Sequence, residues 1–440
     1  MKVMKFGGTS VGRPERMKQV ASLVAEQEES VLVVLSALSG TTNSLVEIGN
    51  LFAAGKQLEA LQAIDQLEKH YQSFVEQLIS EKEARQDAAQ VLVEHFDFLR
   101  INQGIAFSEA IRRDILAQGE LLSTKLFSVY CNEQKLSHAL LPALNFMVLD
   151  QQDEPALPMI STRLKALVQA NVDKKILITQ GYICRNSKGE VDNLKRGGSD
   201  YTASLVAAAI GATVCEIWTD IDGMHNNDPR IVDNTFPVEH LSFDEAAELA
   251  YFGAKILHPS SVWPAQQFQI PVRLLNTLDP TAKGTLISAA PVSAGVKAVA
   301  AKDNIIAIRI KSSRMLLAYG FLRKIFEVFE KYRTPIDMIT TSEVAVSLTI
   351  DNDQHLQAIL EELSLFGYLE VDREQVIVSL VGFEITSTPG ILSNLALAVK
   401  DIPVRMFSYG GSPHNISMLV PAEAKTKLLQ QLNKEIFGLR

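Results

Sequence analysis

The chain has 440 residues, of which 47% are hydrophobic and 21% charged, so two or three globular domains are expected. Its formal net charge of -9 and its lack of a basic run argue against a general nucleic-acid binder, which needs positive charge to neutralise phosphates. The N-terminus has no signal-peptide pattern and no apolar run reaches the roughly 18 residues of a membrane helix, so we expect a cytoplasmic protein without a membrane partner.

The first predicted element is a short apolar strand, VMKF at 3–6, that runs directly into the pair Gly7 and Gly8. Consecutive glycines let backbone N–H groups close on an anion, and Lys5 supplies the opposite charge. The spacing is neither the Walker loop GxxxxGK[ST] nor the Rossmann fingerprint GxGxxG. We therefore predict a phosphate-binding turn of another class, with an ordinary tight turn as the alternative.

Apolar, β-branched runs then alternate with helical patterns up to the region of residue 290. A helix near 14–28 precedes a strand at 31–37, and further strands are predicted at 175–183 and 213–220. This alternation is typical of a mostly parallel sheet with helices on both faces. Residues 44–130 carry long helical periodicity and are predicted to form a helical insertion over the sheet edge.

The segment VVLSALSGTTN at 33–43 ends a predicted strand in the hydroxyl-bearing residues Ser36, Ser39 and Thr42. Open α/β sheets bind ligands at the carboxyl ends of their strands, although hydroxyls at a turn also act as local caps. Further along, QGELLST at 118–124 places Glu120 at a predicted helix start. There it serves either the helix dipole or a substrate ammonium.

The segment NLKRGGSDYTA at 193–203 has Gly197 and Gly198 opening a helix, with Ser199 or Asp200 as the predicted N-cap. The free N–H groups and partial positive charge of a helix start attract anions. Arg196 adds a rigid fork suited to a carboxylate. A glycine turn with an ordinary cap is the alternative, and the second glycine-rich loop at the N-terminus weighs against it.

A further strand end, WTDIDGMHNNDPRIV at 218–232, carries aspartates, and FGAKILHP at 252–259 offers Lys255. Asp220 and Asp222 resemble paired catalytic carboxylates. We interpret Asp220 as a residue of a ligand loop and Asp222 as a turn former before Gly223. A cation beside a glycine, as at Lys255, fits a site for a polyphosphate.

After residues 288–295 the predicted strands and helices follow one another at shorter intervals. One strand is predicted at 304–310 and two within 336–351, with helices at 315–332 and 355–366. The β-α-β-β-α pattern then repeats, which suggests a duplicated ligand-sensing module; two unrelated ferredoxin-like α+β units are the alternative. The repeat comprises segments 376–383, 390–399, 404–411, 415–421 and 422–437.

The three cysteines, Cys131, Cys184 and Cys215, lie far apart in the sequence and form no CxxC pair. Neither a disulfide framework nor a zinc site is indicated by this spacing. We expect three small core residues and no metal site built by the protein.

The motifs together resemble a known family. KFGGTSVG, VVLSALSGTTN, GELLST, TQGY, RGGSDYTA, WTDIDG, NDPR, FGAKILHP and ITTSEV occur in the order found in aspartate kinases of the monofunctional, lysine-sensitive type, across nearly the whole chain. The resemblance implies a three-layer α/β/α sandwich with a mostly parallel sheet, the amino acid kinase fold, plus two α+β ferredoxin-like ACT modules. It places the catalytic domain at 1–292 and the modules at 293–375 and 376–440, with 296–301 adding a strand to the second module.

The resemblance also implies that Lys5 and Asp200 are catalytic, with Asp200 organising the lysine. ATP would bring Mg²⁺ on its phosphates. Where this chain has His225, the family commonly has a tyrosine. The imidazole of His225 can still stack on adenine. The implied nucleotide-binding residues are Lys5, Phe6, Gly7, Gly8, Thr219, Asp220, His225, Arg230, Lys255 and Ile256.

L-Aspartate is the implied phosphoryl acceptor, and 4-phospho-L-aspartate the product. A relative that phosphorylates glutamate or acetylglutamate, and a catalytically silent amino-acid sensor, are the alternatives. Arg196 with Glu120 favours a free α-amino acid. The implied substrate-binding residues are Ser36, Thr42, Glu120, Tyr182, Arg196, Gly197, Gly198 and Ser199.

L-Lysine is the implied feedback inhibitor. Ala318 and Pro335 replace small polar residues often found in the effector pocket, so threonine is the alternative effector. Open sheet edges in the modules predict a homodimer or a dimer of dimers. The implied effector residues are Met315, Gly320, Phe321, Leu322, Ile336, Asp337, Thr341, Ser342 and Glu343.

Overall fold

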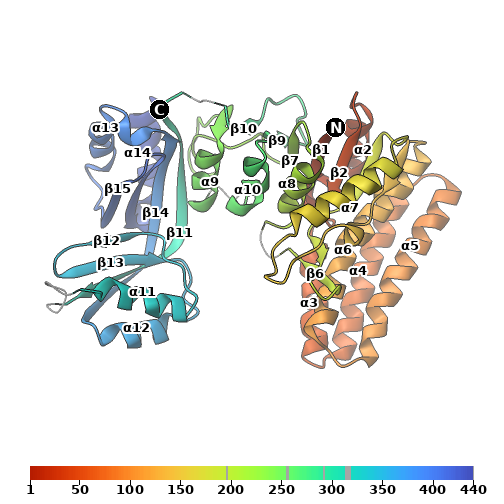
Figure 1. The fold of residues 1–440 in the computed structure, drawn as a ribbon, viewed down its shortest axis with the longest axis horizontal. Helices are drawn as coiled ribbons and strands as arrows, with labels where there is room; N and C mark the ends of the chain where they lie inside the picture. The colour runs from red at the N-terminus through yellow and green to blue at the C-terminus, as the bar shows by residue number, and fades with distance from the viewer. Residues whose placement is uncertain (195–196, 254–256, 291–292, 313–318, 440) are drawn as a thin grey trace. The chain divides into compact units, whose positions relative to one another are not determined.

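The computed structural model describes residues 1–194, 197–253, 257–290, 293–312 and 319–439 (Figure 1). The chain forms two compact units. The first comprises Met1–Gly223 and Leu257–Ala289, and the second Met224–Ile256 and Ala290–Arg440. Arg196, Lys255, Ile256 and Met315, which the sequence analysis assigns to sites, lie outside the described residues.

The first unit is built on a sheet in which parallel strands occupy the centre. Its strands lie in the order β3-β4-β2-β1-β7-β9-β10, parallel as far as β9, and β10 is antiparallel to β9. Short apolar strands that alternate with helices give this topology, because a parallel connection needs a crossover. The bounds are β1 Lys2–Phe6, β2 Val31–Leu35, β3 His138–Leu140, β4 Ile176–Gln180, β7 Cys215–Thr219, β9 Val272–Asn276 and β10 Thr285–Ser288.

Helices cover both faces of this sheet, which confirms the predicted three-layer sandwich. Met4 and Phe6 belong to one hydrophobic core with α2 (Pro14–Ala25) and the helical insertion. Side chains alternate along a strand, so Lys5 between them points to the opposite face. That face carries α8 (Gly198–Ile210), flanked by α7 (Leu157–Ala170) and α10 (Pro259–Gln267).

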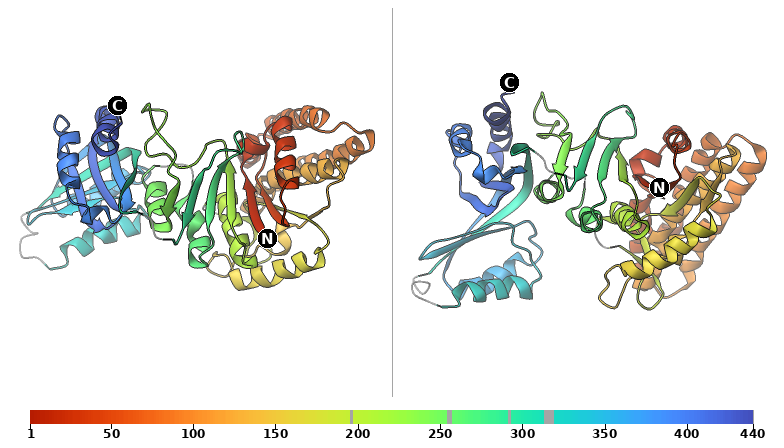
Figure 2. Two further views of the ribbon diagram at one scale, coloured as in Figure 1. Left: turned by 90° about the horizontal axis from the view of Figure 1, so that it is seen from above. Right: turned by 45° about the horizontal axis from the view of Figure 1, so that its top comes forward.

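The helical insertion consists of long helices packed side by side, drawn in orange and yellow in Figures 1 and 2. Its hydrophobic core is continuous with that of the sheet and contains Tyr71, Phe96 and Phe127. The helices are α3 Thr41–Ala53, α4 Gln57–Leu78, α5 Lys82–Ile101 and α6 Glu109–Glu133.

Glu120 lies in the middle of α6, so the predicted helix start at this residue was wrong. The helix begins at Glu109, where the Ser108 hydroxyl accepts a hydrogen bond from the Ile111 N–H (3.3 Å). Gly119 does not break the helix. A Cβ there would lie 2.8 Å from Ala37 Cβ, so the glycine is explained by close approach of α6 to the segment after β2.

The predicted strand at 175–183 is divided. β4 ends at Gln180, and β5 (Ile183–Arg185) pairs with β6 (Val191–Asn193) in a separate small sheet. The break falls where Tyr182 adopts a positive φ of 64°. Gly181 also lies so close to Ser199 that an added Cβ would meet its Oγ at 2.3 Å. Packing against the start of α8 therefore ends the strand.

The second unit contains an antiparallel sheet with strands in the order β12-β13-β11-β14-β16-β15. α11 (Phe321–Lys331) and α12 (Leu356–Ser364) cover one half, while α13 (Ile391–Val399) and α14 (Lys425–Phe437) cover the other (Figure 1). Each half has its own hydrophobic core, as two α+β modules require. The strands are β11 Gly295–Lys311, β12 Ile339–Thr341, β13 Ala345–Ile350, β14 Tyr368–Phe383, β15 Met406–Ser412 and β16 Asn415–Pro421.

The two halves share the long strands β11 and β14. Residues 296–302 of β11 pair with 377–382 of β14, and residues 305–311 pair with 368–375. The second unit also includes β8 (His240–Ser242) and α9 (Phe243–Tyr251). The domain boundaries at 292 and 375 remain predictions.

The helix predicted at 315–332 begins only at Phe321. Gly320 is its N-cap and has a φ of 80°, a left-handed conformation that glycine adopts without strain. Residues 313–318 lie outside the described part of the chain.

All three cysteines are buried, as expected for small core residues. None of the helices in the described part of the chain combines the length and the apolar character that crossing a bilayer requires.

Candidate active site

Lys5 and Asp200 form an ion pair in the first unit. Lys5 stands near the carboxyl end of β1, and Asp200 lies in the first turn of α8. The Lys5 Nζ is 2.6 Å from the Asp200 Oδ1, and both side chains are more than four-fifths buried. A Cβ on Gly7 would be 3.4 Å from the same Nζ, so the ammonium lies beside the glycine turn. The structure thus brings together the two residues predicted to be catalytic.

The N-cap predicted at Ser199 or Asp200 was wrong. Gly197 is the N-cap, with a φ of 66°, and no side chain caps the helix. An added Cβ on Gly197 would meet the Ser261 Oγ at 1.9 Å, so close packing also requires glycine there. Asp200 directs its carboxylate to Lys5 instead of to the helix end.

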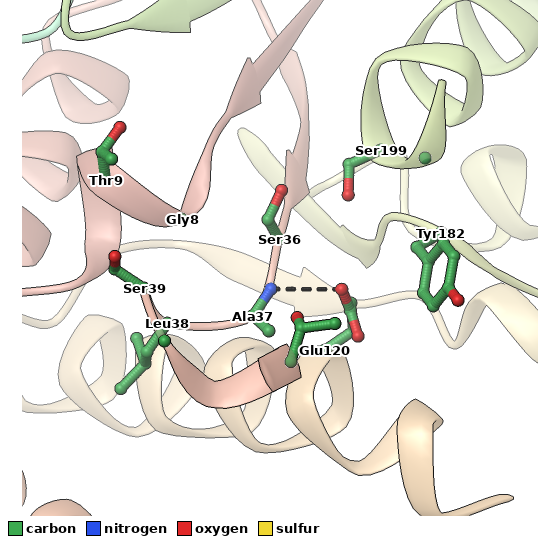
Figure 3. Close-up of a pocket in the computed structure, with 12 residues that line it drawn as sticks. Gly8, Thr9, Ser36, Ala37, Leu38, Ser39, Glu120, Tyr182 and Ser199 are labelled. Carbon is green, nitrogen blue, oxygen red and sulfur yellow. Dashed lines mark hydrogen bonds between the residues drawn. The ribbon is translucent and has the colours of Figure 1, made fainter. Parts of the chain in front are cut away.

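A cavity of about 400 Å³ opens beside this pair, at the carboxyl ends of the parallel strands (Figure 3). It is bounded by the turn after β1, the segment after β2, the middle of α6, the turn after β4 and the first residues of α8. Its lining residues are Gly8, Thr9, Ser36, Ala37, Leu38, Ser39, Gly40, Thr42, Glu120, Tyr182, Gly198 and Ser199.

Glu120 is the acidic group of the cavity. Its side chain is buried, and one carboxylate oxygen accepts a hydrogen bond from the Ala37 N–H (3.3 Å; Figure 3). Burial raises the pKa of Glu120 to about 7. Among the described residues no lysine or arginine forms an ion pair with it. An ammonium group in the cavity would supply the missing charge and favour the ionised carboxylate.

Two α-helices, α3 and α8, begin at the cavity and give it a region suited to anions. α3 starts after Gly40 and α8 after Gly197, so the partial positive charge of both helix starts lies there. Hydroxyls of Ser36, Thr42 and Ser199 line the same space. The cavity therefore offers an acceptor for an ammonium and donors for carboxylate or phosphate oxygens, which suits a free amino acid.

Tyr182 lies across the cavity from the turn after β1 (Figure 3). Its backbone N–H donates to the Thr202 Oγ1 (2.9 Å), which holds the residue in its left-handed conformation. Burial raises the pKa of its hydroxyl. Non-glycine residues with a positive φ cost free energy and concentrate at functional sites, so the geometry agrees with a binding role.

Sequence reasoning missed two hydroxyl residues that position the site. The Ser123 Oγ donates to the Ser36 carbonyl (2.7 Å), and Thr202 holds Tyr182. A signal was present, because Ser123 follows Glu120 by three positions and Thr202 follows Gly198 by four. Residues at these spacings share a helix face.

The residues predicted to bind nucleotide are divided between the two units. In the first, Thr219 is the last residue of β7 and Asp220 follows it, and the Thr219 hydroxyl donates to the Asp220 carboxylate (3.2 Å). The Phe6 side chain is fully buried and stacks on Trp218, with ring centroids 5.8 Å apart. Phe6 can therefore offer a ligand its backbone but not its ring.

In the second unit, the His225 Nδ1 lies 2.9 Å from the Thr235 Oγ1. Arg230 is mostly exposed and forms a bidentate pair with Asp228, which lowers the pKa of that carboxylate. Throughout the described ranges, no three His, Cys, Asp or Glu side chains gather as a metal site would require.

The predicted effector residues lie in the second unit. α11 begins at Phe321, with Gly320 as its N-cap, and Leu322 is exposed. Asp337 is buried, and Ile336 beside it is partly buried. Thr341 ends β12, the Ser342 N–H donates to the Ala345 carbonyl, and Glu343 is exposed.

Comparison with known proteins agrees with this architecture. The amino acid kinase family matches residues 1–276, and the ACT domain matches residues 378–436. The lysine-sensitive aspartokinase 3 of Escherichia coli (strain K12) is 34% identical over 447 residues, which cover 99% of both chains. Aspartokinase 1, chloroplastic, of Arabidopsis thaliana is 34% identical over 99% of this chain and 80% of that protein.

A solved structure extends the likeness to three dimensions. E. coli aspartokinase III in complex with aspartate and ADP has a TM-score of 0.84 at 32% identity, over 99% of this chain and 100% of that one. The matches in sequence and structure span nearly the whole chain, which therefore belongs to the amino acid kinase family and, within it, to the aspartokinases.

Proposed function

We propose that the chain transfers the γ-phosphoryl group of ATP to the β-carboxylate of L-aspartate, giving 4-phospho-L-aspartate. The observation that carries the proposal is the Lys5–Asp200 pair beside a cavity whose buried acid, Glu120, faces hydroxyls and two helix starts. The E. coli relative whose structure resembles this chain is described in complex with aspartate and ADP. This reaction is the first step toward lysine, threonine and methionine.

The reaction needs alignment and charge more than proton transfer. The β-carboxylate has an ordinary pKa near 3.9, so it is ionised at neutral pH and needs no general base. Two anions must meet, and a like-charge pair 4 Å apart costs roughly 4 kcal/mol at an effective dielectric of about 20. Lys5 and the N–H groups of the glycine turn offset this repulsion and stabilise charge on the transferring group.

Asp200 acts through Lys5, because its carboxylate holds the ammonium beside the turn. Lys255 adds a second cation. Mg²⁺ enters as part of the substrate MgATP, since Mg²⁺ is usually held by substrate phosphates and few protein carboxylates. Thr219 and Asp220 of the first unit also contribute to nucleotide binding, and Arg196 binds the α-carboxylate of aspartate, as the family resemblance implies.

Glu120 discriminates between the candidate acceptors. A free α-ammonium would neutralise its buried carboxylate, whereas an N-acetyl group carries no charge and would leave the carboxylate unpaired. Glutamate retains the ammonium but is one methylene longer than aspartate. A sensor without activity would have no use for the Lys5–Asp200 pair.

Measuring ADP release from MgATP with aspartate, glutamate or N-acetylglutamate tests the proposal. We expect turnover with aspartate and far less with the other two acids. Preference for glutamate or N-acetylglutamate would move the chain to another kinase of the same fold. No release with any of the three would favour the sensor.

We also propose regulation by L-lysine, bound in the half of the second unit that contains α11 and β12. The name of the E. coli relative, lysine-sensitive aspartokinase 3, supports this effector, and the exposed Glu343 offers an acidic group for an ammonium. Activity should fall with millimolar lysine, and Glu343→Ala should weaken the effect. Inhibition by threonine but not by lysine would contradict the assignment.

The same proposal includes a cytoplasmic homodimer or dimer of dimers. β12 and β15 are the edge strands of the sheet in the second unit, and pairing between copies would satisfy their open N–H and C=O groups. Light scattering tests this directly. A monomer mass at every concentration, with and without amino acids, would contradict it.

A further inference from the structure

The segment after β2, Ser36–Thr42, forms one wall of the cavity and is fixed by hydrogen bonds from two helices. The Ser123 Oγ on α6 donates to the Ser36 carbonyl (2.7 Å). Glu120 on α6 accepts from the Ala37 N–H (3.3 Å). The third bond comes from α4, where the Tyr71 hydroxyl lies 2.9 Å from the Thr41 Oγ1. The first two belong to the site already described, and the third does not.

The bond between Tyr71 and Thr41 is secluded from water. The Tyr71 side chain is fully buried and Thr41 is 1% exposed. The Tyr71 ring packs edge-to-face on Phe96 of α5, with centroids 5.8 Å apart, so its orientation is set by the insertion. If either hydroxyl is removed, the other loses its partner in a buried environment, where an unsatisfied polar group is costly.

Thr41 is the residue through which this bond reaches the cavity. It is the first residue of α3, and its N–H donates to the Leu38 carbonyl (3.0 Å). Its methyl group lies 3.4 Å from where a Cβ on Gly119 would stand, directly beside Glu120 in α6. A shift of Thr41 would therefore move both the start of α3 and the wall that carries Ser36 and Thr42.

We propose that Tyr71 is a positioning residue for amino-acid binding, which it serves from the helical insertion by holding Thr41 and with it the Ser36–Thr42 segment. This inference rests on the proposed function, since it assigns the segment to the aspartate site. It gives α4, none of whose residues is among those that line the cavity, a part in substrate binding. Tyr71 itself lines neither the cavity nor the glycine turn.

Substitutions that remove one hydroxyl at a time test the proposal. In Tyr71→Phe and Thr41→Val, the KM for aspartate should rise about threefold to tenfold, the range that one net hydrogen bond supplies. kcat and the KM for MgATP should change less than twofold, because the Lys5–Asp200 pair is untouched. In the double variant, the KM for aspartate should be no higher than in the single variant with the larger KM, because both single variants remove the same hydrogen bond.

Tyr130→Phe is the matched control, since Tyr130 lies on α6 in the same hydrophobic core. It should leave the KM for aspartate unchanged. Hydrogen exchange of the free protein adds a readout that needs no substrate, and the amides of 36–44 should exchange faster in Tyr71→Phe than in Tyr130→Phe.

The outcomes separate the two proposals. Equal aspartate KM values and equal exchange in Tyr71→Phe and Tyr130→Phe would overturn the role of Tyr71. A parallel fall in kcat and in the apparent affinity for both substrates would show a general structural role and overturn it as well. If the amides of 36–44 exchange faster in Tyr71→Phe than in Tyr130→Phe but the wild-type chain does not phosphorylate aspartate, only the proposed function is contradicted.

Discussion

The ammonium of Lys302 lies 2.6 Å from the carboxylate of Asp337, whose side chain is 1% exposed. Lys302 also pairs with Asp351 (2.9 Å) and lies 4.5 Å from the centroid of the Tyr251 ring. The Tyr251 hydroxyl donates to Asp337 (2.9 Å). Asp337 is one of the residues implied to bind the effector, and in the structure a lysine of the chain itself pairs with its carboxylate.

Replacing Lys302 by methionine should therefore destabilise the second unit. Removing one partner of a buried pair leaves an uncompensated charge and costs about 3–5 kcal/mol. Lys311→Met is the control on the same strand, because Lys311 and its partner Glu370 are partly exposed and such pairs contribute about 0–1 kcal/mol. The midpoint of urea unfolding measures both, and equal losses would show that the Lys302 pair is no stronger than a surface pair.

The affinity for aspartate should depend on pH through Glu120. Its pKa is raised to about 7 by burial, so the carboxyl is neutral below that pH and cannot pair with the substrate ammonium. kcat/KM for aspartate, which reports the free enzyme, should fall as the pH drops through 7. Glu120→Gln should show a low kcat/KM without this dependence.

Glu47→Gln is the control for the pH profile, since Glu47 is an exposed residue of α3. It should keep the wild-type profile. A profile that persists unchanged in Glu120→Gln would assign the titration to another group.

Gly119→Ala should destabilise the first unit despite the higher helix propensity of alanine. The new Cβ would meet Ala37 Cβ at 2.8 Å, and overpacking costs about 1–3 kcal/mol, which exceeds the gain of about 1 kcal/mol from propensity. Displacement of Ala37 should also raise the KM for aspartate.

Gly49→Ala should instead stabilise the first unit. Its Cβ would stand 3.6 Å from the nearest atom, in Arg112, so the propensity term should dominate and stabilise α3 by about 1 kcal/mol or less. Thermal unfolding of Gly119→Ala and Gly49→Ala measures both changes in stability. Stabilisation by Gly119→Ala would refute the close approach between α6 and the segment after β2.

The sequence predicts the elements whose causes are local. Continuous apolar strands and the glycine pairs at Gly7 and Gly197 indicate the parallel sheet and the anion loops, because each follows from backbone chemistry within a few residues. The juxtaposition of Lys5 with Asp200 was expected from family resemblance, and the structure provides the ion pair.

What the sequence could not predict depends on contacts between distant segments. Glu120 was expected at a helix start, yet it lies in the middle of α6, and Gly119 beside it allows tight packing against Ala37. The positive φ of Tyr182 follows from Thr202, twenty residues away. Tyr71 likewise reaches Thr41 over thirty residues, and a tyrosine within an apolar helix face carries no local sign of such a partner.

Trapping the acyl phosphate tests whether the chain phosphorylates the β-carboxylate of aspartate. An acyl phosphate reacts with hydroxylamine, so the chain incubated with MgATP, L-aspartate and hydroxylamine should yield aspartate β-hydroxamate in step with ADP. Lys5→Met and Asp200→Asn should lower this yield by orders of magnitude while their unfolding midpoints stay close to that of the wild type. ADP release without hydroxamate would contradict phosphorylation of aspartate, and near-normal yield in Lys5→Met would contradict the role of Lys5.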